Sequence, residues 1–293
     1  MVGKGGFVER NLKYIFPLPA VIFIVLLMIF PVAYTLFISF TDWSLTSGRP
    51  MHFAAFATYI RVFNNPRFHA AILRTLVFTL GAVAGEAVLG TIIALILNRE
   101  FPGKQSLKFI LLLPLVVTPV AIGIVFQLFY DPTIGFLNWV LNSVGLPQSG
   151  WITNAKTVMQ SLILVDIWQW TPMIALIILA GLAGLSTEPF ESAMVDGANA
   201  VQTFFRITLP MIMPTVLTAI VLRAVDALKT YDIIYAMTTG GPGYASETLN
   251  ILAYKLSFEY FQMGQASCVL VFLFLIVLFF SLGVMQLRKK FEM

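Results

Sequence analysis

The chain has 293 residues, of which 59% are hydrophobic and 11% charged, and its mean hydropathy is +0.89. A soluble domain does not carry that much apolar surface, so the composition predicts a membrane protein that crosses the bilayer several times. The net charge of +4 is spread over short membrane flanks, which argues against a basic surface for nucleic acid.

Six apolar runs of transmembrane length follow one another along the chain. They are predicted at about 14–40, 75–97, 109–130, 157–183, 211–237 and 265–287. The first run is too long for a signal-peptide core and lacks a small-residue cleavage site, so we expect a retained helix. The predicted fold is all-α, with six transmembrane helices in a single membrane domain over 1–293.

The basic residues predict the orientation of these spans. Six spans put both termini on one side, and that side collects ten basic residues against six on the other. Part of the excess comes from the two ends of the chain, at Lys4, Arg10, Lys13, Arg288, Lys289 and Lys290. Because basic residues concentrate in cytoplasmic loops, we expect both termini to be cytoplasmic.

Between the fourth and fifth spans lies a segment, 186–214, that combines helical periodicity with several charges. Ser186 or Thr187 can cap a helix, and Glu188, Pro189 and Glu191 give it an acidic, proline-containing first turn. Gly197 then interrupts the pattern. Two short amphipathic helices hinged near Gly197 are predicted, which is typical of a docking surface; a helix lying on the lipid surface is the alternative.

The same segment resembles the EAA loop of permease subunits of bacterial ATP-binding-cassette importers. The matching residues are Glu191, Ala193, Asp196, Gly197, Ala198, Ile207, Leu209 and Pro210. Ser192 departs from the usual alanine, but a small residue is kept. The likeness extends into the flanking spans and is greatest to the maltose-type permeases for sugars, polyols and glycerol phosphates. It implies that 186–210 inserts into a cleft of an ATPase through the coupling residues Glu191, Ser192, Ala193, Asp196, Gly197 and Ala198.

This resemblance also implies the partners and the location. They are a second homologous permease subunit, two ATP-binding cassette ATPase subunits and an extracytoplasmic solute-binding protein. All would assemble at the lipid bilayer of a bacterial inner membrane, which this chain crosses as a multi-pass protein. No cofactor is expected in this chain itself, because ATP and Mg would be bound by the partner ATPase.

Motifs for nucleotide binding and hydrolytic chemistry are missing from the sequence. There is no G-x-x-x-x-G-K-[ST] loop, no G-x-S-x-G and no H-E-x-x-H. Cys268 is the only cysteine, and His52 and His69 have no matching set of ligands. We therefore expect no metal site and no enzymatic activity in this chain.

Charged residues inside two of the predicted spans mark a candidate site. Charges are costly within a membrane and usually face a cavity or one another. Arg223, Asp226 and Thr230 share a helical face, with Lys229 beside them, so Asp226 can pair with Arg223 or Lys229. In the fourth span, a second polar and aromatic face is formed by Asp166, Gln169, Trp170 and Met173. Hydrogen-bonding groups beside an aromatic ring suit a sugar, whose hydroxyls need partners and whose C–H faces stack on rings.

Alignment with the maltose-type permeases places the substrate-contacting positions on the same two faces. They fall on Asp166, Gln169, Trp170, Met173, Arg223, Asp226, Ala227 and Thr230. The alternative is a structural ion-pair network of Arg223, Asp226 and Lys229 that holds the helices together. Glu86, in the second span, is interpreted as a helix-packing or partner-subunit contact and is left out of this site.

The expected function is a permease subunit of an ATP-driven importer for a sugar or sugar-like solute. A polyol, a glycoside or an anionic sugar derivative would fit, and Arg223 permits the last without requiring it. One rival is a proton-coupled secondary transporter that uses Asp166 or Asp226. A membrane enzyme is the other rival.

Overall fold

The computed structural model describes residues 13–14 and 16–291, and their side chains as far as residue 286. Within these residues the regular structure is helical, apart from an isolated bridge between Thr41 and Phe53. Lys4 and Arg10, which contribute to the predicted orientation, lie outside the described residues, as do the side chains of Arg288, Lys289 and Lys290. The chain divides into two compact units, 1–65 with 253–272 and 66–252 with 273–293.

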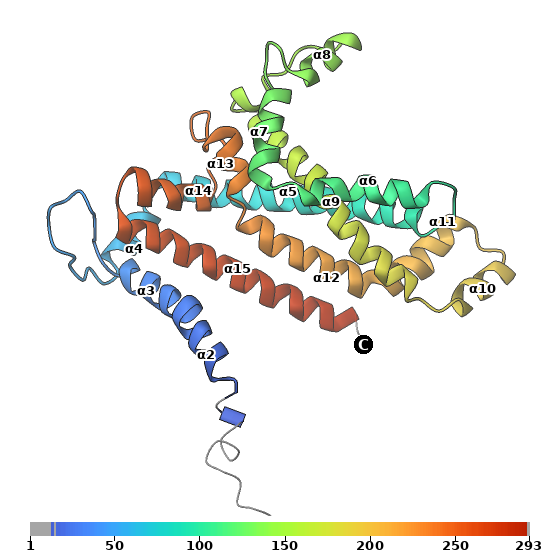
Figure 1. Cartoon of the computed structure of the whole chain (residues 1–293), viewed down its shortest axis with the longest axis horizontal. Helices are drawn as coiled ribbons and strands as arrows, with labels where there is room; N and C mark the ends of the chain where they lie inside the picture. Colours follow the sequence, from blue (N-terminus) through green and yellow to red (C-terminus); the bar gives the residue numbers. More distant parts are fainter. Residues whose placement is uncertain (1–12, 15, 292–293) are drawn as a thin grey trace, which may run out of the picture. The chain divides into compact units, whose positions relative to one another are not determined.

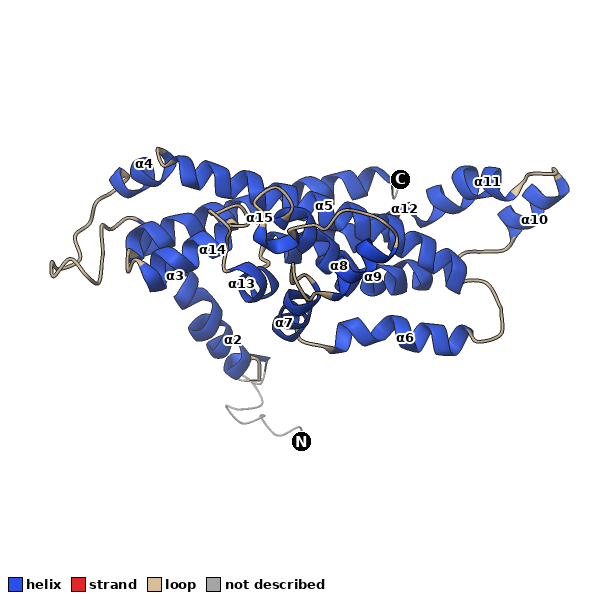
Figure 2. Cartoon of the chain, turned by 90° about the horizontal axis from the view of Figure 1, so that it is seen from above, coloured by secondary structure: helices blue, strands red, loops and turns tan. Residues whose placement is uncertain are grey.

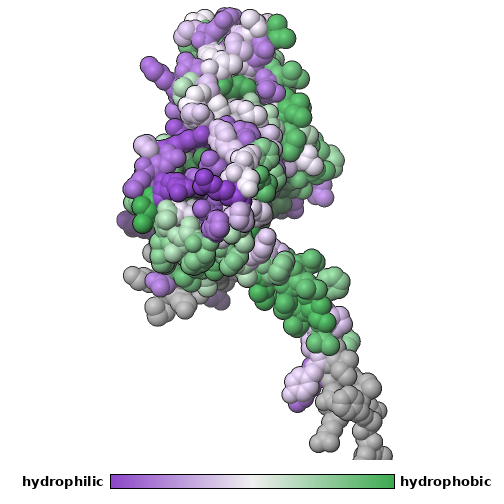
Figure 3. Space-filling view, turned by 90° about the vertical axis from the view of Figure 1, so that its left-hand side faces the viewer, coloured by the Kyte–Doolittle hydropathy of each residue, from purple (hydrophilic) through white to green (hydrophobic). Residues whose placement is uncertain are grey.

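The first unit contains a long apolar helix near the N-terminus. Helix α2 (Leu18–Ile24) continues through a π-helical turn, η1 (Val25–Ile29), into α3 (Phe30–Ser39). The wide turn precedes Pro31, which has no N–H to donate to the ordinary helical ladder. Most side chains of this helix are exposed, and Figure 3 shows the resulting hydrophobic surface in green. Such a surface fits contact with lipid or with another membrane helix.

Two stretches of chain complete this unit. Helix α4 (Ala57–Phe63) follows the bridge. The chain then returns to the unit at the end of α14 (Leu249–Tyr254) and runs through the π-helical η4 (Lys255–Glu259) into the first part of α15 (Met263–Phe291), as far as Phe272. Gly264 at the start of α15 is needed for close packing, because a Cβ there would lie 2.2 Å from the carbonyl oxygen of Thr41. The Tyr59 hydroxyl hydrogen-bonds Ser39 at 2.6 Å, which ties α4 to the end of α3.

The second unit is built on α5 (Pro66–Leu97), α9 (Val158–Ala183) and α12 (Leu209–Leu228), which lie side by side (Figure 1). Helix α5 packs along α9 because small residues line its contact face. A Cβ on Gly85 would lie 2.4 Å from Cδ1 of Ile167. Glycine therefore lets these two helices approach closely, as is common in membrane proteins. This approach brings Glu86, next to Gly85, close to Asp166, next to Ile167.

The third predicted span is broken in two. Helices α6 (Lys104–Val116) and α7 (Pro119–Phe129) meet at 98°, and α7 turns away from the direction of α6 in Figure 1. The break follows from Pro119, because a residue before proline avoids the helical conformation, and Thr118 is accordingly extended. A continuous helix over 109–130 was the expectation. Helix α8 (Phe136–Ser143) and the 3-10 turn η2 (Trp151–Thr153) occupy the segment that follows.

The fifth span also differs from its predicted bounds of 211–237. Its helix begins inside the preceding segment, as α11 (Ala200–Thr203) and the π-helical η3 (Phe204–Thr208), and runs on through α12. It ends at Leu228, where the Asn250 amide donates to the Lys229 carbonyl at 2.6 Å. Helix α13 (Asp232–Thr238) is a separate short element. A polar turn over 229–231 therefore stands where a continuous span was expected.

The number of spans agrees with the sequence-based expectation. Five described helices are long and apolar enough to cross a membrane, and the bent pair α6–α7 gives a sixth. The second span starts earlier than predicted, at Pro66 in place of 75, while the fourth, Val158–Ala183, lies within one residue of its predicted bounds. The all-α, six-span class is thus confirmed. Figure 2 shows the helical character of the described chain.

Candidate functional site

A buried arginine joins three helices of the second unit. The Nε atom of Arg223, on α12, lies 2.9 Å from Oε2 of Glu86 on α5. Its Nη2 donates a hydrogen bond to Oδ2 of Asp166 on α9. All three side chains are at most 1% exposed. The Trp170 ring packs over the same guanidinium, 5.0 Å from ring centroid to Cζ, so the charge is compensated on several sides.

A polar cavity of about 270 Å³ opens beside this arginine. The residues that line it come from α9, α12, α13, the turn between the last two and the start of α7. They are Pro119, Asp166, Gln169, Trp170, Arg223, Asp226, Lys229, Thr230, Tyr231, Asp232 and Ile233. Six of the eight predicted substrate-binding residues are thus brought together.

The other two predicted residues, Met173 and Ala227, are absent from the described lining of the cavity. Met173 is half-buried one helical turn beyond Gln169. Ala227 is 2% exposed and packs with Val83 and Ala224 between α5 and α12. Its small side chain lets α12 pack on α5, which is a structural role.

Gln169 is the polar side chain that connects the cavity to the broken helix. Its Nε2 donates to the Val117 carbonyl at 3.4 Å, which satisfies a backbone group released by the break between α6 and α7. Its Oε1 is buried without a hydrogen-bond partner among the described residues. Because buried acceptors are nearly always paired, this oxygen is an exception that the described residues do not satisfy, and it belongs to a side chain that lines the cavity.

Of the two partners predicted for Asp226, the structure confirms Lys229 and not Arg223. Asp226 pairs with Lys229 at 3.4 Å, and both side chains are about half exposed. Its predicted alternative partner, Arg223, is held by Glu86 and Asp166. Thr230 lies past the end of α12, so it does not share a helical face with Arg223 and reaches the cavity from the turn. The contacts of Arg223 therefore fit the structural ion-pair alternative with different partners.

We predict that Asp226→Asn changes the free energy of unfolding by less than about 1 kcal/mol, because an exposed ion pair contributes little. Thermal unfolding of the purified complex measures it. A loss of stability comparable to that of a buried charge left unpaired would show that the Asp226 carboxylate compensates Arg223 after all.

Glu86 is the charged residue of this cluster that the sequence interpretation left out. It lies 80 residues before Asp166 and 137 before Arg223, so no local spacing connects it to either residue. The available signal was its place in a transmembrane helix directly after a glycine, where a neighbouring helix can approach an acid closely.

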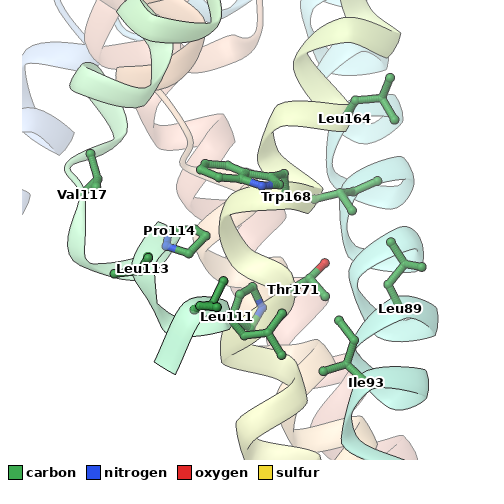
Figure 4. Close-up of a pocket in the computed structure, with 12 residues that line it drawn as sticks. Leu89, Ile93, Leu111, Leu113, Pro114, Val117, Leu164, Trp168 and Thr171 are labelled. Carbon is green, nitrogen blue, oxygen red and sulfur yellow. The ribbon is translucent and has the colours of Figure 1, made fainter. Parts of the chain in front are cut away.

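A second, larger cavity is apolar and lies on the other side of α9. It measures about 620 Å³ and is lined by Leu89, Ile93, Ile110, Leu111, Leu113, Pro114, Val117, Leu164, Ile167, Trp168, Thr171 and Pro172. Figure 4 shows its side chains arriving from α5, α6 and α9. A lining with so few polar groups does not suit a hydroxylated solute, so the smaller polar cavity is the better candidate.

The segment predicted as a docking loop is a helix-turn-helix between α9 and α12. Helix α10 (Glu188–Val195) begins after Thr187, whose side chain makes no capping bond. It ends in a Schellman motif: the N–H of Ala198 donates to the Ala193 carbonyl at 2.9 Å and that of Gly197 to Met194 at 3.2 Å. Gly197 has a φ of +74°, which only glycine adopts readily.

Asn199 starts the second helix immediately after this turn. Its side chain accepts from the Gln202 N–H at 2.9 Å, while the Gln202 side chain accepts from the Asn199 N–H at 2.9 Å. This reciprocal capping box satisfies two backbone donors that a helix start leaves free. Only Gly197 and Ala198 lie between Asp196, the C-cap of α10, and Asn199, the N-cap of α11. The geometry of the turn is therefore fixed at both ends.

The loop exposes both charged and large apolar side chains. Of the predicted coupling residues, Glu191, Ser192, Asp196 and Gly197 are exposed, Ala198 is half-buried and Ala193 is buried. Met194 and Val195 are 77% and 88% exposed, and Val201 and Phe205 are exposed on the second helix. Large apolar side chains exposed on a short, fixed turn are typical of a protein-binding surface.

These features define a polytopic helical membrane protein with a charged cavity between its helices and a helix-turn-helix loop that exposes apolar side chains. Residues 86–291 match the family described as "Binding-protein-dependent transport system inner membrane component". The chain belongs to this family. It is therefore a permease component of a binding-protein-dependent transport system, embedded in the inner membrane.

Relatives cover nearly the whole chain. It is 32% identical over 293 residues to the trehalose/maltose transport system permease protein MalF of Thermococcus litoralis, covering 99% of this chain and 97% of the relative. It is 34% identical over 266 residues to the sulfoquinovosyl glycerol transport system permease protein SmoG of Agrobacterium fabrum, covering 91% and 86%. A chain of a bacterial alginate ABC transporter, solved with a periplasmic protein holding an alginate pentasaccharide, has the same fold, with a TM-score of 0.82 at 21% identity over 97% and 96% of the two chains.

Proposed function

We propose that this chain is one of two homologous permease subunits of an ATP-driven importer for a sugar or sugar-like solute. The observation that carries the proposal is that one continuous helical segment, 200–228, links the docking loop at one end to the charged cavity at the other. A movement imposed on the loop can therefore reach Arg223 and Asp226 through a rigid element. The carbohydrate relatives support a polyhydroxylated solute.

The partners follow from the same family membership. A single subunit offers one wall of a pathway, so we infer a second permease, two ATPases at the cytoplasmic face and an extracytoplasmic solute-binding protein. The loop over 186–210 would lie in the cytoplasm with both termini. ATP and Mg would be bound by the ATPases, and this chain would carry out no hydrolysis.

The chemistry of the cavity suits a sugar. Trp170 is half-buried at its edge and offers a ring, Gln169 offers an unpaired acceptor, and Thr230 offers a hydroxyl. Asp226 and Lys229, both about half exposed, add a charged acceptor and a charged donor. Sugar hydroxyls both donate and accept, so a mixed set of this kind can pair with several of them.

The test replaces cavity residues singly. We expect Trp170→Ala and Gln169→Ala to lower the initial rate of solute uptake by roughly fivefold to tenfold at low solute concentration, because each loses about 1 kcal/mol of recognition. Trp170→Phe should be intermediate. Assembly and basal ATP hydrolysis should persist, because neither residue carries the ion pairs between the helices. The measurement is uptake into vesicles at matched complex content, with the solute that the cognate binding protein delivers.

Matched controls come from the same helix. Trp168 is two residues from Trp170 and lines the apolar cavity, and Gln160 is exposed near the start of α9. Trp168→Ala and Gln160→Ala should leave uptake unchanged. Unchanged uptake in both Trp170→Ala and Gln169→Ala would place the solute site elsewhere, most simply in the partner permease.

A further inference from the structure

Negatively charged residues outnumber positively charged ones in the lining of the polar cavity. Three carboxylates line it, on Asp166, Asp226 and Asp232, against two cations, on Arg223 and Lys229. The two cations differ in access, because the Arg223 side chain is 1% exposed whereas that of Lys229 is 52% exposed. The sign of the electrostatic potential in the cavity therefore depends on how fully the acidic groups compensate each cation.

Both cations have acidic partners, and one of these acids lies behind the cavity. Lys229 pairs with Asp226, and Arg223 pairs with Asp166 and also with the fully buried Glu86. With Glu86 included, four carboxylates face two cations, which leaves a net charge of −2. If one proton is shared between the two acids at Arg223, the net charge is still −1.

From this arrangement we propose that Glu86 is a specificity-determining residue, which keeps Arg223 unavailable to anions and makes the cavity select an uncharged polyhydroxylated solute. The inference rests on the proposed function and names its substrate class. Solutes that carry a carboxylate, sulfonate or phosphate group are disfavoured. Glu86 acts through Arg223 and does not itself line the cavity.

Anionic solutes are excluded because of the free-energy cost of replacing the carboxylate partners of Arg223 inside the membrane. An anionic solute could use Arg223 only by displacing Asp166 or Glu86, which would leave a buried carboxylate without its cation. It would also meet the excess negative charge at short range, where screening by salt is weak. A neutral sugar avoids both penalties, since its hydroxyls can donate to Asp226 and Gln169 and accept from Lys229 without displacing either acid from Arg223.

A thiol placed in the cavity measures this potential directly and without knowledge of the solute. Thr230 is half-buried and lines the cavity, and the native Cys268 is fully buried. In the assembled complex, Thr230→Cys is reacted with an ammonium-bearing and a sulfonate-bearing methanethiosulfonate. The ratio of the two rates is compared with the ratio for 2-mercaptoethanol in solution. Complex without the Thr230→Cys change reports any reaction of Cys268.

We expect the cationic reagent to be favoured over the anionic one relative to 2-mercaptoethanol. Glu86→Gln, added to Thr230→Cys, should lower the ratio by roughly threefold, because an acid that compensates Arg223 is removed and the guanidinium charge is then less fully balanced. The Asp226 side chain is exposed, so the fold should tolerate Asp226→Asn even if it does not tolerate Glu86→Gln. Asp226→Asn should lower the ratio as well. Glu100→Gln removes an exposed acid beyond the end of α5 and should leave the ratio unchanged.

A ratio at or below that of 2-mercaptoethanol would overturn the proposal, as would a ratio that Glu86→Gln leaves unchanged in the assembled complex. If the Glu86→Gln complex does not assemble, a ratio that Asp226→Asn leaves unchanged would overturn it. This outcome is distinct from failure of the proposed function. The labelling reports the sign of the potential in the cavity, whereas the uptake of the Trp170 and Gln169 variants reports whether solute passes through it.

Discussion

Replacing Arg223 with methionine is expected to destabilise the assembled protein more than any other single substitution considered for the cavity. The change leaves Glu86 and Asp166 buried and facing each other without a cation. Removing one partner of a buried ion pair costs about 3–5 kcal/mol. The expected result is a fall in the unfolding temperature of roughly 10 °C, measured by thermal unfolding of the purified complex.

Two further variants test whether the unpaired buried acids cause the loss of stability. Lys229→Met also removes a cation from the cavity, but from an exposed pair, and should change the unfolding temperature only slightly. Adding Glu86→Gln and Asp166→Asn to Arg223→Met removes the unpaired charges and should recover part of the loss. If Arg223→Met is no more destabilising than Lys229→Met, the ion pairs of Arg223 with Glu86 and Asp166 do not hold these helices together.

Gly197→Asp is expected to abolish ATP-driven uptake while leaving membrane insertion intact. Gly197 adopts a left-handed conformation that costs an L-residue roughly 1–2 kcal/mol, so the Schellman turn between α10 and α11 is strained or lost. A Cβ at this position meets no atom of the chain within 4 Å. The damage is therefore expected in the turn geometry and in the docking surface, with little effect on the packing of the spans.

Gly145 provides a matched control. It also has a φ of +74° with no atom within 4 Å of an added Cβ, but it follows α8, far along the chain from the docking loop. Gly145→Asp should thus carry the same backbone strain without the functional loss. The measurement is solute uptake together with ATPase activity stimulated by the binding protein, in vesicles with each variant. Normal stimulation and uptake in Gly197→Asp would contradict a coupling role for the loop.

The helix-turn-helix structure of the loop over 186–210 was predictable because its signals are local. A glycine at the end of an amphipathic pattern, followed by a second pattern, indicates a helix-turn-helix, and Gly197 indeed has the left-handed conformation that ends α10. The break of the third span was also encoded locally, by Pro119 after Thr118. It was missed because hydropathy alone does not distinguish a straight span from a bent one.

The charged cluster could be predicted only in part, because partner choice depends on packing between distant segments. The two polar faces around Asp166 and Arg223 follow from helical spacing, and the structure brings six of the eight predicted residues to one cavity. Which acid meets Arg223 depends on how closely α5 approaches α9. That approach is set by Gly85 against Ile167, and helical spacing in one segment carries no information about it.

The most direct test of the central claim is the energy source of uptake through this chain. Vesicles containing the two permeases and the ATPases are loaded with ATP, supplied with the binding protein and its solute, and treated with a proton ionophore. The account predicts uptake that requires internal ATP and the ATPases, survives the ionophore, and disappears in Gly197→Asp. Uptake by the permeases alone that the ionophore abolishes would contradict it, and would indicate a proton-coupled carrier using Asp166 or Asp226.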